Sequence, residues 1–520
     1  MGGNKPLGNL SDEITIDQPG IVENDSFPKI SPTPKEVRHL RVGITIDRLG
    51  VVENNSIPII SATAKAAGHE VILVEFDADP QKAISRLKDF KPDVLAYSVM
   101  SPEANRYIEI NDILKKEVGG YSIFGGVHPT FFQQYIENDG VDAICVGEGD
   151  IAFRDFLNNF GTDEMFETTN MHFKLDDGSI KKNGISKLIE DIDSLPMPDK
   201  GIVYEESYGL RHLPIRNFFA TRGCPYKCTY CFNHAFNEMY RGKGSIVRMK
   251  TVPYMIEEIK STLREYPAQF LKFQDDVFGI KKDWMDEFAE VYPKEIGLPY
   301  VALVRPNMVN EHYARNLKKS GCHAVAIAIE SGNDEIRNNV MERSMKSEQI
   351  SDAFDLLRDN GIKTYCYSML GLPGETLANF KETLHLNQEL DVDYASASIF
   401  QPYPGIKMTK YALDNGFLDE EQQSWGGQFS ESVLNFPQNL KDTLHTYHVM
   451  FPLLVEYPWL ERWIGQLEAT YKTGPGKSLM NIILRLSYGW MLWRRIYPVS
   501  VPFRLLAWNA YTLIFSRHRN

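Results

Sequence analysis

Three of the six cysteines of this chain stand close together, in the segment RGCPYKCTYCF at residues 222–232. Cys224, Cys228 and Cys231 have the spacing C-x3-C-x2-C, whereas the other cysteines are scattered singly. Thiolates gathered in one short segment are typical of a metal site. A cubane iron–sulfur cluster normally takes four cysteine ligands, so three cysteines would leave one iron with an open position. The spacing therefore predicts a cluster that has room for a further ligand.

Zinc is the second hypothesis for this segment, with His234 as a fourth ligand three residues after Cys231. A structural zinc ribbon would usually bring a second pair of cysteines, and the sequence has none. The remaining cysteines, Cys145, Cys322 and Cys366, lie in apolar segments or next to a turn, where packing is the simpler interpretation. The pattern favours an iron–sulfur cluster over zinc.

The composition is that of a globular protein with more than one domain. The chain has 520 residues, of which 43% are hydrophobic and 24% charged, and this length exceeds one ordinary core. Cysteines without a regular framework spacing indicate a reducing compartment. The sequence shows neither an apolar signal region at its start nor a run of ~20 apolar residues. We therefore expect a cytoplasmic protein.

Two alternating strand and helix patterns must position the cysteine segment. Strand-like apolar runs at 40–46, 70–76, 93–99, 121–126 and 142–147 predict a doubly wound, flavodoxin-like α/β domain over residues 38–165. After a linker at 166–210, six further runs predict a partial six-unit βα barrel over 211–410. The cysteine segment follows the first of these six strands, where a barrel places its functional loops.

Small residues follow three strands of the first domain, in SVMSP (98–102), GGVHPT (125–130) and GEGD (147–150). Ligands of doubly wound sheets bind at the carboxyl ends of the strands. Glycines there let a bulky, flat ligand approach the backbone. This edge is therefore a candidate ligand site.

The two ends of the chain differ from its middle. Residues 14–35 and 44–65 align without gaps, with 14 of 22 positions identical, but the first copy contains Pro28, Pro32 and Pro34, which oppose a helix. We interpret residues 1–37 as a duplicated arm without stable structure. Residues 411–520 have a helical pattern that ends in a basic, aromatic tail.

Several motifs resemble the radical S-adenosylmethionine (SAM) superfamily. These are the cysteine loop with Tyr230 before its third cysteine, FQDDVF (273–278), ESGNDEIRNNVMERSM (330–345) and GLPGET (371–376). The upstream domain, with GGVHPT and VGEGD, is similar to the B12-binding domain that precedes the barrel in one branch of this superfamily. The resemblance covers roughly residues 39–410.

The resemblance implies a 4Fe-4S cluster on the three cysteines, SAM on the open iron and a 5′-deoxyadenosyl radical produced by one-electron cleavage. The candidate SAM-binding residues are Tyr230, Asp276, Arg305, Glu330, Ser331, Arg343, Gly371 and Gly374. The candidate cobalamin-binding residues are Ser98, Ser101, Gly125, Gly126, His128, Gly147, Glu148 and Gly149. No side chain is assigned as a catalytic acid or base.

One departure concerns cobalamin. Domains that bind cobalt through a histidine carry D-x-H-x-x-G after the first strand, and this chain has DRLGVV (47–52), with Leu49 in the histidine position. The departure implies cobalamin without a protein imidazole, or a domain that has lost its cofactor.

The resemblance implies methylation or rearrangement of an unactivated carbon in a small-molecule or lipid-like substrate, with an external electron donor such as flavodoxin or ferredoxin. The alternatives are a cobalamin-binding sensor with a non-catalytic barrel, and a radical SAM enzyme that has lost cobalamin. A methylthiotransferase would want a second cluster, which the scattered cysteines do not provide.

The charge distribution bears on partners. The net charge is −13, yet residues 471–520 hold eight Lys or Arg and no Asp or Glu. The acidic body argues against nucleic-acid binding. The tail is either a helical cap on the barrel or a segment that lies on anionic lipid, which would bring the protein to the inner membrane face.

Overall fold

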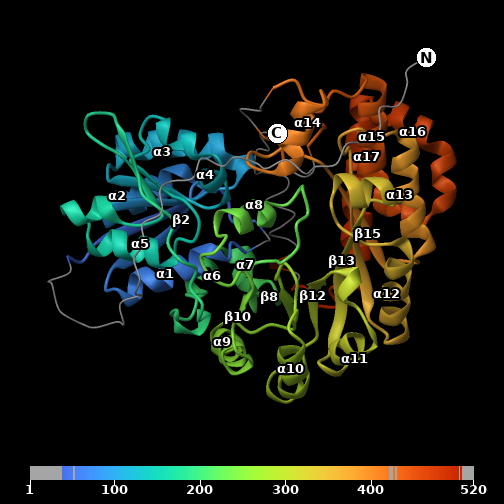
Figure 1. The fold of residues 1–520 in the computed structure, drawn as a ribbon, viewed down its shortest axis with the longest axis horizontal. Helices are drawn as coiled ribbons and strands as arrows, with labels where there is room; N and C mark the ends of the chain where they lie inside the picture. The colour runs from blue at the N-terminus through green and yellow to red at the C-terminus, as the bar shows by residue number, and fades with distance from the viewer. Residues whose placement is uncertain (1–37, 51–52, 421–424, 428–429, 503, 506–520) are drawn as a thin grey trace.

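The computed structural model describes residues 38–50, 53–420, 425–427, 430–502 and 504–505. The arm predicted over residues 1–37 lies outside this range. The described chain forms an α/β domain with a mostly parallel sheet, a second domain with a wholly parallel sheet, and a helical C-terminal region (Figure 1). The predicted fold class is confirmed.

The first sheet has the strand order β2-β1-β3-β4-β5-β6-β7, and its first five strands in sequence are parallel. The order β2-β1-β3-β4-β5 is that of flavodoxin-like domains. The parallel strands are almost entirely apolar and buried because helices cover both faces of the sheet. The strands are β1 (Arg41–Ile46), β2 (Glu70–Glu75), β3 (Val94–Ser98), β4 (Tyr121–Gly125) and β5 (Ala143–Cys145), and the helices are α1 (Ser56–Ala66), α2 (Pro80–Phe90), α3 (Ala104–Glu117), α4 (Val127–Phe131) and α5 (Asp150–Asn158).

Residues 166–210, predicted as a linker, contain regular structure. Strands β6 (Met171–Lys174) and β7 (Ile180–Lys182) form an antiparallel hairpin that extends the first sheet beyond β5. The turn of this hairpin contains Asp177 and Gly178, with Gly178 at a φ of +81°. An Asp-Gly pair between short strands is a hairpin signal, and it is present in the sequence KLDDGSIKK. Two short helices, α6 (Gly201–Glu206) and α7 (Tyr208–His212), follow.

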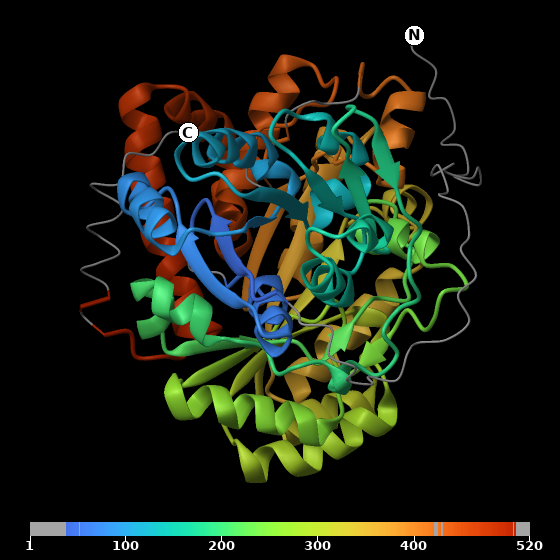
Figure 2. The same ribbon diagram turned by 90° about the vertical axis from the view of Figure 1, so that its left-hand side faces the viewer.

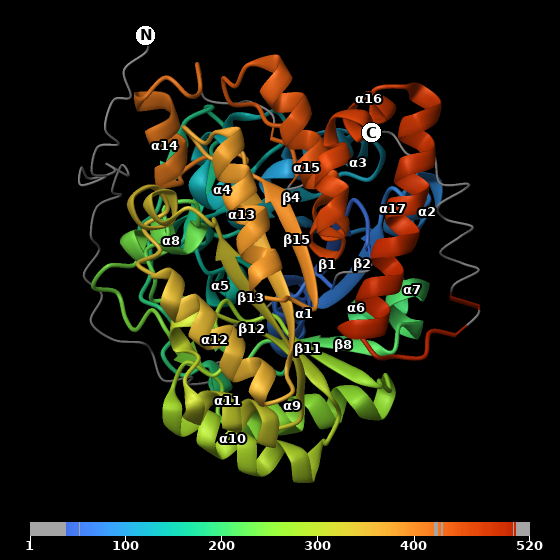
Figure 3. The same cartoon turned by 90° about the vertical axis from the view of Figure 1, so that its right-hand side faces the viewer.

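The second sheet has the order β15-β14-β13-β12-β11-β8, and all of its strands are parallel. Helices cover its outer side, so the sheet is an open barrel of six units (Figure 3). Its strands are β8 (Ile215–Phe218), β11 (Phe270–Phe273), β12 (Tyr300–Val304), β13 (Cys322–Glu330), β14 (Lys363–Leu370) and β15 (Tyr394–Ile399), and its helices are α9 (Val252–Glu265), α10 (Lys282–Glu295), α11 (Glu311–Lys319), α12 (Ser347–Asp359) and α13 (Leu377–Glu389).

The first domain lies across the open side of this barrel (Figure 2). The cysteine loop runs between a two-residue strand, β9 (Thr221–Arg222), and helix α8 (Phe232–Met239). Strand β9 pairs with β10 (Arg248–Met249) in a small antiparallel ribbon outside the barrel sheet. Helix α8 lies between the first domain and the barrel strands (Figure 1).

The C-terminal region packs against the last barrel strand and closes one end of the barrel. Helix α15 contacts β15 and α13, and Met491, Ile496 and Val499 form a core cluster with Phe270 and other residues near the amino ends of the barrel strands. Within the described residues no helix is long and apolar enough to cross a membrane. The helices are α14 (Lys407–Asp414), α15 (Gln438–Glu456), α16 (Ile464–Tyr471) and α17 (Gly474–Arg495).

Candidate functional site

The cysteine loop is fastened to the carboxyl end of the barrel. The Thr229 backbone N–H donates to the Met341 carbonyl at 3.2 Å, and the Thr229 hydroxyl donates to the Val340 carbonyl at 2.6 Å. From α8, the Asn237 amide donates to the Cys224 carbonyl at 2.8 Å. These bonds hold the loop where the barrel strands end, as its position after the first strand predicts.

Two of the thiols have raised pKa values. Burial, with a smaller contribution from the nearby Asp276 carboxylate, raises the pKa of Cys224 to about 11 and that of Cys231 to about 12. These thiols are therefore protonated at neutral pH until a metal displaces the protons. Arg305 already places a guanidinium N–H 3.2 Å from the Cys228 sulfur.

The geometry does not present a site for one ion. No group of three or more His, Cys, Asp or Glu side chains in the described part of the chain is arranged to hold a single metal ion. His234 is buried, and its Nδ1 has no hydrogen-bond partner among the described residues. The structure thus offers the zinc hypothesis no preformed site, whereas a cubane cluster distributes its cysteines over different irons.

Glu330 ends β13 in a strained conformation. Its φ is +65°, and the pairing of β13 with β14 is irregular between Ala328 and Glu330. A non-glycine residue at positive φ costs about 1–3 kcal/mol and is often found at ligand sites. The carboxylate accepts a hydrogen bond from the Tyr230 hydroxyl at 2.9 Å and lies 3.3 Å from an Arg343 guanidinium nitrogen.

Two arginines join this group to the cysteine loop. Arg343 also donates to the Ala328 carbonyl at 2.7 Å and contacts the Tyr230 hydroxyl. Arg305 donates to the Arg343 carbonyl, and its guanidinium carbon lies 3.9 Å from the centre of the Tyr226 ring. Tyr230, Arg305, Glu330 and Arg343 therefore form one connected polar cluster beside Cys228.

Asp276 lies near Cys224 and Cys231. It is exposed and lines a cavity. Burial raises its pKa, and a hydrogen bond with the Asn233 side chain lowers it. A carboxylate in this position can accept hydrogen bonds from a cationic group in the cavity.

The other three candidate SAM residues are occupied by protein contacts. Ser331 is fully buried, and its hydroxyl accepts the Asn333 backbone N–H at 3.2 Å, so it shapes the turn after β13. Gly371 and Gly374 have φ values of +74° and +80°. Leu444 lies beside the first glycine and Phe417 beside the second, at 2.9 and 3.2 Å from where a Cβ would stand.

A cavity of about 430 Å³ separates the carboxyl edge of the first sheet from the cysteine loop. This volume lies within the usual range of ligand pockets. Of the candidate cobalamin residues, Ser98, Gly125, Gly126, Gly147, Glu148 and Gly149 line it. From the barrel side it is lined by Phe219, Thr221, Arg222, Gly223, Asn233, Phe236, Arg248 and Asp276.

Ser101 and His128 do not reach this cavity. Both are buried, and the His128 Nδ1 lies 3.1 Å from the Ser101 hydroxyl oxygen. The His128 ring packs edge-on against Tyr135 and Trp425, and burial lowers its pKa to about 4. Leu49 is likewise buried in the core of the first domain. We therefore find no imidazole at the position that the D-x-H-x-x-G motif would provide.

Four charged residues on the cavity wall were not recognised as a group from the sequence. Arg222 makes two hydrogen bonds of 2.8 Å to Asp150, and Arg248 makes two of 2.9 and 2.7 Å to Glu148. Burial alone would raise the pKa of Asp150, but Arg222 outweighs it and keeps the carboxylate ionised. The sequence contains a signal for this group, because Asp150 belongs to the candidate ligand segment GEGD and Arg222 comes directly before Gly223 and Cys224 of the cysteine segment.

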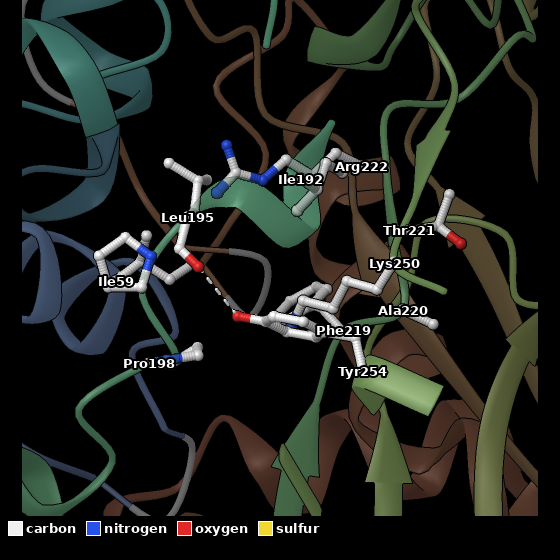
Figure 4. Close-up of a pocket in the computed structure, with 11 residues that line it drawn as sticks. Ile59, Ile192, Leu195, Pro198, Phe219, Ala220, Thr221, Arg222, Lys250 and Tyr254 are labelled. Carbon is white, nitrogen blue, oxygen red and sulfur yellow. Dashed lines mark hydrogen bonds between the residues drawn. The ribbon is translucent and has the colours of Figure 1, made fainter. Parts of the chain in front are cut away.

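A second, smaller cavity of about 30 Å³ also has Arg222 in its wall (Figure 4). Ile59 of the first domain, Leu195 and Pro198 of the connecting segment, and Lys250 and Tyr254 of the barrel domain meet there. The Tyr254 hydroxyl donates to the Leu195 carbonyl at 3.2 Å. This volume corresponds to about one water molecule, so it is a packing seam and not a ligand pocket.

Comparisons with known proteins agree with this architecture. A family model described as "Radical SAM superfamily" matches residues 218–386, and one described as "B12 binding domain" matches residues 41–157. An uncharacterized methyltransferase of Pyrococcus horikoshii is 26% identical over 64% of this chain and 72% of its own length. The anaerobic magnesium-protoporphyrin IX monomethyl ester cyclase of Cereibacter sphaeroides is 23% identical over 77% of this chain and 68% of its own length.

Among solved structures, the radical SAM methyltransferase TsrM from Kitasatospora setae, determined with cobalamin and a 4Fe-4S cluster bound, has a similar fold. The TM-score is 0.59 at 14% identity, and the match covers 73% of this chain and 76% of that one.

Proposed function

We propose, from the premise that this chain belongs to the radical SAM enzymes that carry a B12-binding domain, that it transfers a methyl group to an unactivated carbon of its substrate. The two domains imply a 4Fe-4S cluster, SAM and cobalamin as cofactors. When bound, the cluster and SAM supply a 5′-deoxyadenosyl radical, and cobalamin supplies a methyl carrier.

In this proposal Cys224, Cys228 and Cys231 hold the cluster. The position of the loop supports the assignment, because its hydrogen bonds to the Val340 carbonyl and from Asn237 hold the three cysteines at the carboxyl end of the barrel. Glu330 and Arg343, held by Tyr230, offer a carboxylate and a guanidinium to the polar groups of SAM. On the cavity side, the Asp276 carboxylate accepts hydrogen bonds from a cationic group of the ligand.

The observation that carries the proposal is the shared cavity. Gly125, Gly126 and Gly147 bring bare backbone to one wall, and Asp276 and Gly223 bring the neighbourhood of the cysteines to the other. A cofactor on the glycine edge would therefore face the cluster loop directly. A Cβ at Gly126 would stand 2.7 Å from the Val99 carbonyl oxygen, so only glycine fits at this position.

Methyl transfer is tested without knowing the substrate. The anaerobically reconstituted protein should contain iron, sulfide and cobalamin, and with SAM and a reductant it should form both S-adenosylhomocysteine and 5′-deoxyadenosine. The first product records loss of the SAM methyl group and the second records radical formation. Protein that binds neither cluster nor cobalamin would refute the proposal.

Rearrangement or ring formation is the second candidate reaction, and the similarity to the cyclase named above favours it. A cyclase-type enzyme would form 5′-deoxyadenosine without S-adenosylhomocysteine. Cobalamin binding without either product would indicate the sensor alternative. Formation of 5′-deoxyadenosine by protein that binds the cluster but no cobalt would indicate an enzyme that has lost cobalamin.

The reaction needs an external reductant, for which we propose flavodoxin or ferredoxin, and a small-molecule or lipid-like substrate. We further propose that the protein is cytoplasmic and contacts the inner face of the membrane through α17. Ile482, Leu486, Trp490 and Trp493 are exposed on this helix, and Leu486 is 70% exposed. Their spacing places them on one face.

The basic charge near this face of α17 supports the proposal that it binds an anionic lipid surface. The Arg494 guanidinium lies 5.0 Å from the centre of the Trp490 ring, and residues 471–520 carry only basic charges. Exposed tryptophan beside arginine is typical of segments that lie in a membrane interface. The opposite side of the helix packs on the barrel through Met491.

Flotation with anionic liposomes tests the contact. The unmodified protein should float, and Leu486→Glu should remain in the dense fraction because a charge enters the apolar face. Leu377→Glu is the matched control, since Leu377 is an exposed leucine of the barrel domain. Equal flotation of Leu486→Glu and the control would refute the membrane contact.

A further inference from the structure

Two arginines of the barrel domain bind two carboxylates of the first domain in the wall of the cavity. Arg222 and Arg248 are register partners in the ribbon formed by β9 and β10. Arg222 binds Asp150 through two hydrogen bonds, and Arg248 binds Glu148 in the same two-fold manner. A further 3.6 Å contact between Arg222 and Glu148 links the two pairs into one group, which we call the charge clamp.

The charge clamp connects the two candidate cofactor regions, which are the cysteine loop and the glycine edge of the first sheet. Arg222 is followed directly by Gly223 and Cys224, so its position sets where the cysteine loop begins. Gly223 has a φ of +82°, and a Cβ there would lie 2.1 Å from the Ile246 carbonyl, which leaves the chain one path after Arg222. On the other side, Glu148 stands between Gly147 and Gly149 on the glycine edge.

The geometry of the charge clamp fixes the relative position of the two domains as well as holding them together. A guanidinium that makes two parallel bonds to a carboxylate fixes both distance and orientation, which a single lysine contact does not. The Arg248 and Asp150 side chains are only 2% and 7% exposed, so water competes little for these bonds. The strands that carry the arginines have two residues each and contribute nothing to the pairing of the barrel sheet.

We propose that the charge clamp sets the separation between the iron–sulfur cluster and cobalamin, with Arg222 and Asp150 as positioning residues. The inference rests on the cofactors of the proposed function. Reacting groups must be held within a fraction of an ångström for efficient transfer, so a clamp between the two loops that present them is where this precision would be set.

The test measures the separation directly. Reduced cluster and Co(II) cobalamin are both paramagnetic, and their dipolar interaction in electron paramagnetic resonance reports the distance between them. The wild-type protein should show one narrow distance. Asp150→Asn, which keeps the shape but removes the charge that Arg222 clasps, should show a shifted or broadened distance at unchanged iron and cobalt content.

The matched control is Glu456→Gln, which removes a bidentate carboxylate from Arg495 (2.7 and 2.8 Å) at the helical end of the molecule. It should leave the distance unchanged. If Asp150→Asn does not keep the wild-type circular dichroism spectrum, Arg222→Lys is measured in its place. This variant keeps both charges but loses the planar guanidinium that makes two parallel hydrogen bonds to Asp150. A wild-type distance in the folded variant would overturn the inference, whereas wild-type protein that binds no cluster or cobalamin would refute the proposed function instead.

Discussion

The carboxyl edge of the first sheet and the carboxyl edge of the barrel sheet both lie near the cysteine loop, and they are built from different residues. The first edge contains Gly125, Gly126, Gly147 and Gly149, and it borders an open cavity. The barrel edge presents Glu330 and Arg343, which are already in contact with each other and with Tyr230 of the cysteine loop.

The difference indicates two ways of holding a ligand. Glycines provide space and backbone groups, which suits a large flat cofactor that covers the edge. The paired charges of the barrel edge provide strong but exchangeable bonds, which suits a small charged ligand that takes the place of one partner. Changes at the barrel edge should therefore abolish chemistry, and changes at the glycine edge should mainly weaken binding.

The largest effect should come from Cys231→Ala. With two thiolates left, the reconstituted protein should lose its iron and sulfide and form no 5′-deoxyadenosine. Cobalamin binding should persist because the glycine edge is untouched. Cys366→Ala, a buried cysteine of β14, is the control and should keep the full cluster. Normal iron content in Cys231→Ala would mean that the cluster lies elsewhere.

Arg343→Lys should have the next largest effect. Arg343 bonds the Ala328 carbonyl and the Tyr230 hydroxyl as well as contacting Glu330, and lysine cannot reproduce this fork. Losing a hydrogen bond to a charged group costs about 1.5–3 kcal/mol, so SAM affinity should fall roughly tenfold or more. The change that SAM causes in the spectrum of the reduced cluster measures this affinity. Arg358→Lys, in an exposed ion pair with Asp355, should bind as the unmodified protein does.

Gly126→Ala tests the other edge and should weaken cobalamin binding by about tenfold. The new Cβ would meet the Val99 carbonyl at 2.7 Å, and the φ of +99° is unfavourable for alanine by about 1–2 kcal/mol. Gly119→Ala has a similar positive φ, of +80°, but nothing within 4 Å of the new atom, so it separates backbone strain from contact. Titration of cobalamin followed by absorption measures both. Equal weakening in the two variants would show that the edge itself is not involved.

The same comparison shows what the sequence could reveal. Continuous apolar runs identify the buried parallel strands of both sheets, and Gly125, Gly126, Glu330 and the three cysteines stand at the ends of those strands or in the segments that follow them. Such features are local, since each depends on a strand and the residues that follow it. The predicted fold class and cofactors were therefore accessible without a structure.

Features that depend on contacts between distant segments were not accessible. Asp150 and Arg222 look like separate surface charges until the two domains meet. His128 looks like a ligand in GGVHPT, but α4 turns it into the core, where it packs against Trp425 of the C-terminal region. Gly371 looks like an open approach to a ligand, but Leu444 of α15 fills the space beside it. In each case the contacting residue comes from a distant segment of the chain, and local sequence patterns do not show that the two segments meet.

The smallest expected effect concerns Glu375, in the GLPGET loop of the barrel edge. Burial raises its pKa to about 8, even though the hydrogen bond from the Leu372 backbone N–H to its carboxyl, at 2.9 Å, opposes this shift. Because the unfolded chain has the ordinary pKa near 4.5, the folded state binds this proton more tightly. The contribution to stability is complete below pH 4.5 and is lost as the pH rises through 8.

Glu375→Gln removes this titration while keeping an oxygen that accepts the Leu372 N–H. The melting temperature of the variant should therefore rise relative to that of the wild-type protein between pH 5 and pH 8, and the difference should be constant at higher pH. Glu348→Gln, at an exposed position on α12, should show no such trend. A difference that does not change with pH would mean that the Glu375 carboxyl has the same pKa in the folded and the unfolded protein, so that burial does not shift its titration.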